Sequence, residues 1–150
     1  MSFKAFGLGF HHLGLAVRKP DSATDFLYRL GYRIGKVVLD VEQNVNLVWC
    51  AHSVMPSIEL VYPTDTSGPV SELLERAGES VYHTCYETSD VKASVDAIET
   101  AGHRVVCVRT AKPAILFGGR EVSFYYVGGF GLIELLSSER GPMSGGTDVA

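Results

Sequence analysis

The sequence predicts an α+β fold made of two tandem βαβββ modules. The first observation is that the tripeptide Ile-Glu-Leu occurs twice, at residues 58–60 and 133–135. The second is that each copy closes a stretch that opens with a histidine in a strand-like run. The third is that one helical segment and several strand-like segments lie between each histidine and its tripeptide. The chain is therefore predicted to be a duplicated module.

The two stretches also align position by position. His12 and His83 are 71 positions apart, and the same shift maps Gly31-Tyr32-Arg33-Ile34 onto Gly102-His103-Arg104-Val105 without a gap. The second stretch is then about four residues longer before its glutamate, as a longer loop would cause. Each half thus offers one histidine and one glutamate at matching places.

The first module is expected over about residues 10–62. After His12, polar or small residues alternate with apolar ones up to Val17, which indicates a strand. Pro20-Asp21-Ser22 supplies a helix start, apolar residues follow at helical spacing, and Gly31 suits a left-handed C-cap. Further strands are predicted at residues 32–40, 45–50 and 57–62.

The second module is expected over about residues 81–136, after a polar linker and a short helix at residues 70–77. Ser89-Asp90 begins its helix, and Gly102 ends it. Strands are predicted at residues 81–88, 103–108, 114–117, 122–127 and 132–136. We expect a single domain over residues 1–137 and, because residues 138–150 are polar and glycine-rich, a disordered tail there.

Composition and charge restrict the partners. The chain has 13 basic and 17 acidic residues, a net charge of −4, and no cluster of Lys or Arg, which argues against nucleic acid and anionic membranes. No run of 18 apolar residues suggests a membrane span, and residues 1–10 lack the apolar segment of a signal peptide. The three cysteines form no CxxC pair, which is typical of reduced thiols. We expect a soluble, cytoplasmic protein.

The two glutamates are flanked by apolar residues in strands that should be buried. An isolated ionised carboxylate is strongly disfavoured there unless it is paired or ligates a metal. Two neutral imidazoles and two carboxylates suit one divalent ion, with Ni, Co, Mn, Zn or Fe favoured by nitrogen and oxygen ligands. The predicted ligands are His12, Glu59, His83 and Glu134. The alternative is that Arg104 or Arg120 neutralises the carboxylates in salt bridges.

The other histidines and one cysteine are weaker candidates. His11 has the wrong parity relative to His12, and His52 lies in a break between strands. His103 is the counterpart of Tyr32, so we expect all three of these histidines to be structural or exposed. Cys85 shares a face with His83 and could line a pocket, although a small apolar filler is the expected role.

These residues resemble the vicinal oxygen chelate superfamily, in which two βαβββ modules form a cupped mixed sheet around a metal. The matching segments are His12-Leu13-Gly14-Leu15-Ala16-Val17 for its opening strand, Ile58-Glu59-Leu60 for its fourth strand, His83 for its second histidine and Ile133-Glu134-Leu135 for its closing strand. The resemblance runs from about Phe10 to Ser137. It implies a glyoxalase-like fold with one divalent metal ion held by the four residues.

Within the superfamily, the chain looks most similar to the methylmalonyl-CoA epimerase-like branch. The motifs that carry this resemblance are Glu42-Gln43, Pro63, Gly68-Pro69-Val70 and Gly118-Gly119-Arg120. It implies an isomerase or epimerase that moves a proton next to the carbonyl of a small acyl compound such as an acyl thioester, with Glu134 as base. In that branch a third-strand glutamate serves as a second base, and here the register places Leu47 at that position.

Other residues and functions stay open at this point. Asn46, Leu47, Lys112 and Arg120 are candidates for contact with a small-molecule substrate. A glyoxalase I-like lyase would use the same four ligands, and a ligand-binding or resistance protein of this fold would perform no chemistry. Because superfamily members commonly pair and exposed sheet edges favour pairing, we also expect a homodimer.

Overall fold

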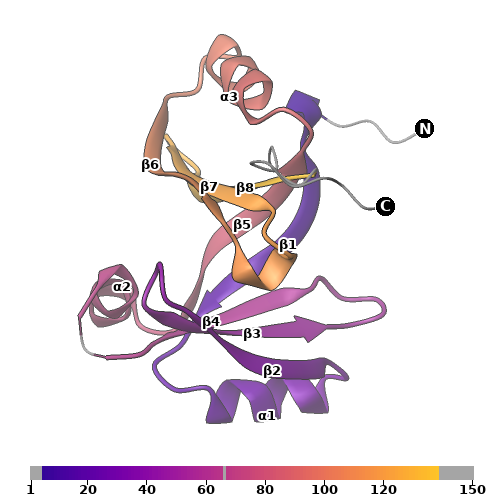
Figure 1. Cartoon of the computed structure of the whole chain (residues 1–150), viewed down its shortest axis with the longest axis vertical. Helices are drawn as coiled ribbons and strands as arrows, with labels where there is room; N and C mark the ends of the chain where they lie inside the picture. The colour runs from indigo at the N-terminus through magenta and orange to yellow at the C-terminus, as the bar shows by residue number, and fades with distance from the viewer. Residues whose placement is uncertain (1–4, 66, 139–150) are drawn as a thin grey trace, which may run out of the picture.

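The computed structural model describes residues 5–65 and 67–138, and within them eight strands form one mixed sheet in the order β2-β3-β4-β1-β5-β8-β7-β6 (Figure 1). The predicted α+β class and duplicated organisation are confirmed. Apart from Ser138, the predicted tail lies outside the described residues, as do residues 1–4. The limits of a single domain at residues 1–137 therefore stay a prediction.

The first module follows the predicted order. Its elements are β1 (Gly9–Ala16), α1 (Asp21–Arg29), β2 (Arg33–Asp40), β3 (Val45–Ala51) and β4 (Ile58–Pro63). Gly31 ends the first helix with φ +99°, a backbone conformation that favours glycine. The helix α1 lies along β2, β3 and β4 at the bottom of Figure 1.

The second module repeats this arrangement after α2 (Pro69–Ala77). Its elements are β5 (Ser80–Thr88), α3 (Val91–Thr100), β6 (Val105–Pro113), the 3-10 turn η2 (Ile115–Phe117), β7 (Glu121–Val127) and β8 (Gly131–Ser137). A further 3-10 turn, η1 (Ala5–Gly7), precedes β1. The Asp90 side chain accepts a hydrogen bond from the Ala93 amide and caps α3. The helix α3 lies at the top of Figure 1.

The strand predicted at residues 114–117 is wrong, because these residues form η2. The amides of Phe117 and Gly119 both donate to the carbonyl of Ala114, and Gly118 adopts the left-handed conformation. A run of four apolar residues satisfies a strand and a buried turn equally well, so hydrophobicity alone does not distinguish them. The turn contacts β2 of the first module.

The topology brings the two modules together through their first strands. β1 and β5 pair antiparallel at the centre of the sheet, β4 runs parallel to β1, and β8 runs parallel to β5. The register places Glu59 beside Gly14 of β1 and Glu134 beside Cys85 of β5. The four predicted ligands therefore come from four adjacent strands.

Alternation along these strands divides the side chains between two faces. One face packs against α1 and α3, where Leu60 joins a core cluster with Leu27 of α1, and Leu135 joins one with Ile98 of α3. The neighbouring glutamates point to the other face, which we call the cup. No helix within residues 5–65 and 67–138 combines the length and apolar character needed to cross a bilayer.

Candidate metal centre

The four predicted ligands meet in the cup. His12, Glu59, His83 and Glu134 each offer a ligand atom, and these atoms all lie within 4.8 Å of one another. The four residues are only 0%, 5%, 2% and 3% exposed, respectively. The fold therefore gathers two imidazoles and two carboxylates at one buried point.

The distances among these atoms suit a coordination shell. His12 Nε2 lies 3.4 Å from both His83 Nε2 and Glu134 Oε1, and His83 Nε2 lies 3.6 Å from Glu134 Oε1. Glu59 Oε1 lies 3.9 Å from His12 Nε2 and 3.8 Å from His83 Nε2. Two atoms that each lie about 2.1 Å from a tetrahedrally coordinated ion are about 3.4 Å apart. The donor set and spacing thus fit one divalent cation.

The hydrogen bonds around Glu134 and Arg120 support a metal site rather than the salt-bridge alternative. Among the described residues, Glu134 Oε1 is buried without a hydrogen-bond partner, a costly arrangement for a carboxylate. Arg120 instead donates to Glu87 Oε2 at 2.9 Å and to the carbonyl of Ser137 at 2.7 Å. Arg104 is exposed, whereas both glutamates are buried. A cation at the cluster would satisfy the carboxylates.

Burial and mutual charge set the protonation of the cluster. Burial lowers the pKa of His83 to about 4, so its imidazole is neutral at pH 7, as a metal ligand must be. Burial, with the nearby carboxylates of Glu134 and Asp40, raises the pKa of Glu59. Burial also acts to raise the pKa of Glu134, but the two histidines outweigh it, and the net pKa is lowered.

Small residues make room for the histidine rings. Gly14 lies opposite His83 in the β1–β5 pairing, and Cys85 lies opposite His12. Cys85 is fully buried and packs with Val122 and Leu136. Burial raises the pKa of its thiol, so Cys85 stays protonated as a small core residue.

Aromatic rings pack against both ligating histidines. Trp49 of β3 lies 5.2 Å from the His12 ring, and Phe124 of β7 lies 5.4 Å from the His83 ring, measured between centroids. Phe117 of η2 lies 5.4 Å from the His12 ring and 5.5 Å from Trp49. These rings are not among the predicted site residues, although Trp49 follows Leu47 by two positions in β3 and so shares its face.

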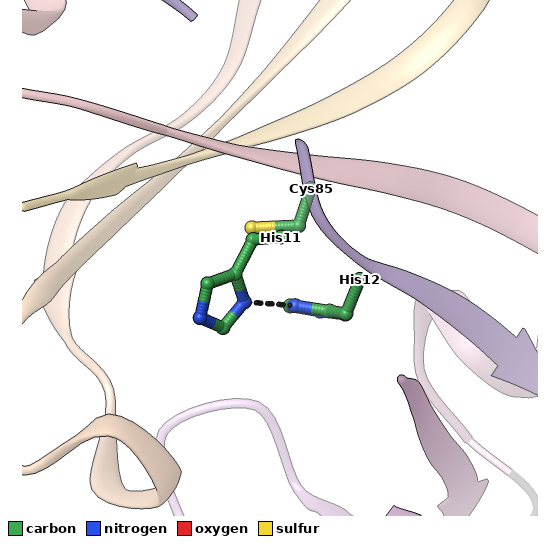
Figure 2. A group of neighbouring side chains, drawn as sticks. All are labelled: His11, His12 and Cys85. Carbon is green, nitrogen blue, oxygen red and sulfur yellow. Dashed lines mark hydrogen bonds between the residues drawn. The ribbon is translucent and has the colours of Figure 1, made fainter. Parts of the chain in front are cut away.

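The parity argument for His11 is wrong because β1 contains a bulge. Phe10 pairs with Tyr86 and His12 with Cys85, so His11 is an extra residue that turns toward the cup. Its Nδ1 atom lies 2.8 Å from the Nδ1 atom of His12 (Figure 2). His11 is half-buried, and burial together with His12 lowers the pKa of its imidazole.

The four predicted substrate residues lie in different places. Leu47 faces the cup, 4% exposed, in a cluster with Val45 and Val61. Asn46 alternates to the opposite face of β3, and Lys112 is exposed on β6. Arg120, half-buried, is held by the two hydrogen bonds described above. The structure therefore brings only Leu47 of these four into the interior of the cup.

The remaining histidines lie outside the cluster. His52 Nε2 bonds the carbonyl of Leu30, and its Nδ1 accepts from the amides of Val54 and Met55, which is the expected structural role. His103 is exposed and lines a cavity of about 780 Å³ near α3. Tyr86 and Ile133 also line that cavity, and because they alternate with Cys85 and Glu134, it lies on the face opposite the cup.

Comparisons with known proteins agree with this architecture. Residues 11–124 match the family described as the Glyoxalase/Bleomycin resistance protein/Dioxygenase superfamily. An ethylmalonyl-CoA/methylmalonyl-CoA epimerase of Cereibacter sphaeroides is 30% identical over 134 residues, which cover 83% of this chain and 94% of that protein.

Solved structures are similar over most of the chain. The methylmalonyl-CoA epimerase of Mycobacterium tuberculosis superposes with a TM-score of 0.73 at 23% identity, covering 91% of each chain. A variant of the Streptomyces coelicolor methylmalonyl-CoA epimerase, in complex with 2-nitronate-propionyl-CoA, gives a TM-score of 0.63 at 25% identity and covers 85% of this chain and 94% of that one. The fold of the chain is thus that of these epimerases.

Proposed function

The chain belongs to the glyoxalase/bleomycin resistance protein/dioxygenase superfamily, and on that premise we propose that it is a metal-dependent epimerase of an acyl-CoA thioester. We propose a substrate of the methylmalonyl-CoA type, because the similar Cereibacter protein is an ethylmalonyl-CoA/methylmalonyl-CoA epimerase. The observation that carries the proposal is the convergence of two imidazoles and two carboxylates at one buried point.

We propose that His12, Glu59, His83 and Glu134 hold one divalent ion. The neutral state of His83 and the unpartnered Oε1 of Glu134 support this role. When bound, such an ion supplies Lewis-acid stabilisation of the negative charge that develops on a substrate carbonyl oxygen. Ni, Co, Mn, Zn and Fe are the ions that suit this set of nitrogen and oxygen ligands.

Glu134 is the proposed base. Its lowered pKa keeps the carboxylate ionised at neutral pH, so it can accept the proton from the carbon next to the thioester carbonyl. The surrounding rings of Trp49 and Phe117 exclude water and so strengthen the electrostatic interactions at the site.

Because Leu47 stands where a second base would act, the proposed reaction uses a single base. Epimerisation removes a proton from one face of the substrate carbon and returns one to the other face. Where a second carboxylate would act, the cup has the apolar wall of Val45, Leu47 and Val61. The deprotonated acyl group must therefore turn over before Glu134 returns a proton. We expect exchange of the substrate hydrogen with solvent to be faster than inversion.

The same observation favours a second candidate, a glyoxalase-like isomerisation of a thiohemiacetal. That reaction moves a proton between adjacent carbons on one face, so a single carboxylate is sufficient. The two candidates share the four ligands and Glu134 as base. They differ only in the substrate that the cup accepts.

Deuterium exchange tests the proposal and separates the two candidates. Metal-loaded protein in D₂O is incubated with methylmalonyl-CoA or with the thiohemiacetal of methylglyoxal and a thiol, and the substrate hydrogen is followed by NMR. We expect exchange in methylmalonyl-CoA, with a loss of about 100-fold or more in Glu134→Gln. Glu99→Gln, on an exposed position of α3, is the control. Exchange that is unchanged in Glu134→Gln contradicts the role of Glu134.

A homodimer and a cytoplasmic location stay predictions. The three cysteines are free, with Cys50 and Cys85 buried and Cys107 exposed, as expected of a protein kept in a reducing compartment. Sedimentation equilibrium of the metal-loaded protein tests the dimer.

A further inference from the structure

We propose that His11 is a positioning residue for His12: it accepts the proton of His12 Nδ1 and so turns the bare Nε2 of His12 toward the cluster. This inference rests on the proposed metal centre and goes beyond it, because it assigns a function to a residue outside the four ligands. It starts from the 2.8 Å contact between the two Nδ1 atoms.

The contact has one donor and one acceptor. Two neutral imidazoles can share an N–H···N bond only if one Nδ1 carries a proton and the other does not. His12 Nε2 points at His83 Nε2 and at Glu134 Oε1, each 3.4 Å away, so it must be unprotonated to act as a ligand. His12 then carries its proton on Nδ1, and His11 Nδ1 is the acceptor. Such outer partners orient a ligating histidine and raise its basicity.

The bulge that creates this contact occurs in both modules. Gly14 pairs with His83 and Leu15 with Val81, so Tyr82 is an extra residue in β5, as His11 is in β1. The duplication shift of 71 relates Tyr82 to His11 and His83 to His12. Both bulges therefore place the preceding side chain against a ligating histidine.

The two bulges nevertheless serve their histidines differently. The Tyr82 ring packs edge-on against the His83 ring, with centroids 4.5 Å apart, and among the described residues His83 Nδ1 has no hydrogen-bond partner. His83 is thus held by packing, whereas His12 is held by a directional hydrogen bond. Of the two rings, only that of His12 has its proton position fixed by a protein group.

Aromatic rings hold His11 itself in place. Its ring lies edge-on to Phe117 at 5.4 Å and tilted against Trp49 at 5.7 Å. The second nitrogen of His11 points away from His12 and Cys85 (Figure 2). The acceptor role therefore falls to His11 Nδ1.

A near-isosteric pair of variants tests this inference. His11→Asn keeps an acceptor, its carbonyl oxygen, close to the place of Nδ1, whereas His11→Leu removes the acceptor at nearly the same size. We expect the Kd for Zn²⁺, measured by chelator competition, to rise about 10- to 100-fold in His11→Leu and to stay near the wild-type value in His11→Asn. Glu99→Gln, at an exposed position of α3, is the control and should bind Zn²⁺ like the wild type.

A second readout reports the proton directly. In ¹⁵N-labelled, Zn²⁺-loaded wild type, we expect a scalar coupling across the hydrogen bond between the two Nδ1 atoms, with the proton on His12. A proton on His11 Nδ1, or equal Zn²⁺ affinity in the wild type and His11→Leu, overturns the inference and leaves the proposed function intact. A different outcome is that the coupling is seen and His11→Leu binds Zn²⁺ more weakly, but the wild type exchanges no substrate proton. That outcome supports the inference and contradicts the proposed function.

Discussion

Gly14 and His83 face each other across β1 and β5 so closely that a Cβ atom on Gly14 would lie 2.1 Å from Cε1 of the His83 ring. The His83 ring thus occupies the space that a side chain at position 14 would need. Because Gly14 has no positive φ, its role is steric. Because glycine has no side chain, Gly14 in β1 leaves room for the His83 ring on the neighbouring strand β5.

Gly14→Ala should displace the His83 ring without breaking the sheet. We expect about 100-fold lower turnover, because a shift of about 1 Å in a reacting group costs about that much. Zn²⁺ affinity should fall as well, and chelator competition measures it. Gly128→Ala is the control, since the added Cβ would meet Arg104 at 3.4 Å in ordinary contact. Wild-type affinity in Gly14→Ala contradicts the close approach.

Glu59→Gln should have opposite effects without and with metal. The folded pKa of Glu59 is raised above its ordinary value of 4.5, so in metal-free protein its ionisation costs stability as pH rises through the folded pKa. We expect Glu59→Gln to be more stable than the wild type in EDTA at neutral pH. With saturating Zn²⁺ the order should reverse, because the ion binds the wild type more tightly. Urea unfolding measures both, and a wild type that is the more stable protein in EDTA contradicts the prediction.

His83 should make the metal-free protein sensitive to mild acid. Its folded pKa of about 4 lies below the ordinary 6.5, so its contribution to stability is full above pH 6.5 and is lost as pH falls toward 4. The loss amounts to about 3 kcal/mol. The loss is best measured in a Glu59→Gln background, which removes the opposite pH dependence of Glu59. The experiment compares urea unfolding with and without His83→Gln in that background. An equal pH dependence in the two proteins contradicts a buried, neutral His83.

Phe117→Ala should open the cup. Phe117 packs on the rings of His12 and Trp49, and the four ligands beneath are almost fully buried. We expect the rate of Zn²⁺ removal by EDTA, followed by stopped-flow with a metal indicator, to rise in this variant. Phe130→Ala, at a residue 63% exposed on the turn after β7, is the control. Equal rates in the two variants and the wild type contradict the role of η2 as a cover.

Much of the fold follows from sequence because its signals are local or repeated. The shift that relates His12 to His83 pairs the modules, and alternation places Glu59 and Glu134 opposite apolar core residues. A duplicated strand–helix unit leaves few ways to arrange the sheet. The four-residue cluster could therefore be predicted, whereas its distances and protonation could not.

The errors have a common physical origin in tertiary contacts. Alternation along β1 predicts the wrong face for His11, because the bulge there depends on the register with β5, which a single strand's pattern does not contain. The apolar pattern of residues 114–117 predicts a strand, but the contacts of Leu116 and Phe117 with the first module favour a turn. Those contacts are not contained in the local sequence. Leu47 lies in the cup, packed with Val45 and Val61.

Metal content per chain tests the central claim most directly. The wild type, purified without a His tag and analysed by inductively coupled plasma mass spectrometry, should contain one divalent ion per chain, and His83→Ala should lose it. Glu99→Gln, prepared in parallel, should keep it. A wild type that retains no ion, even after exposure to Ni²⁺, Co²⁺, Mn²⁺ and Zn²⁺, contradicts the metal centre and favours a ligand-binding protein of the same fold.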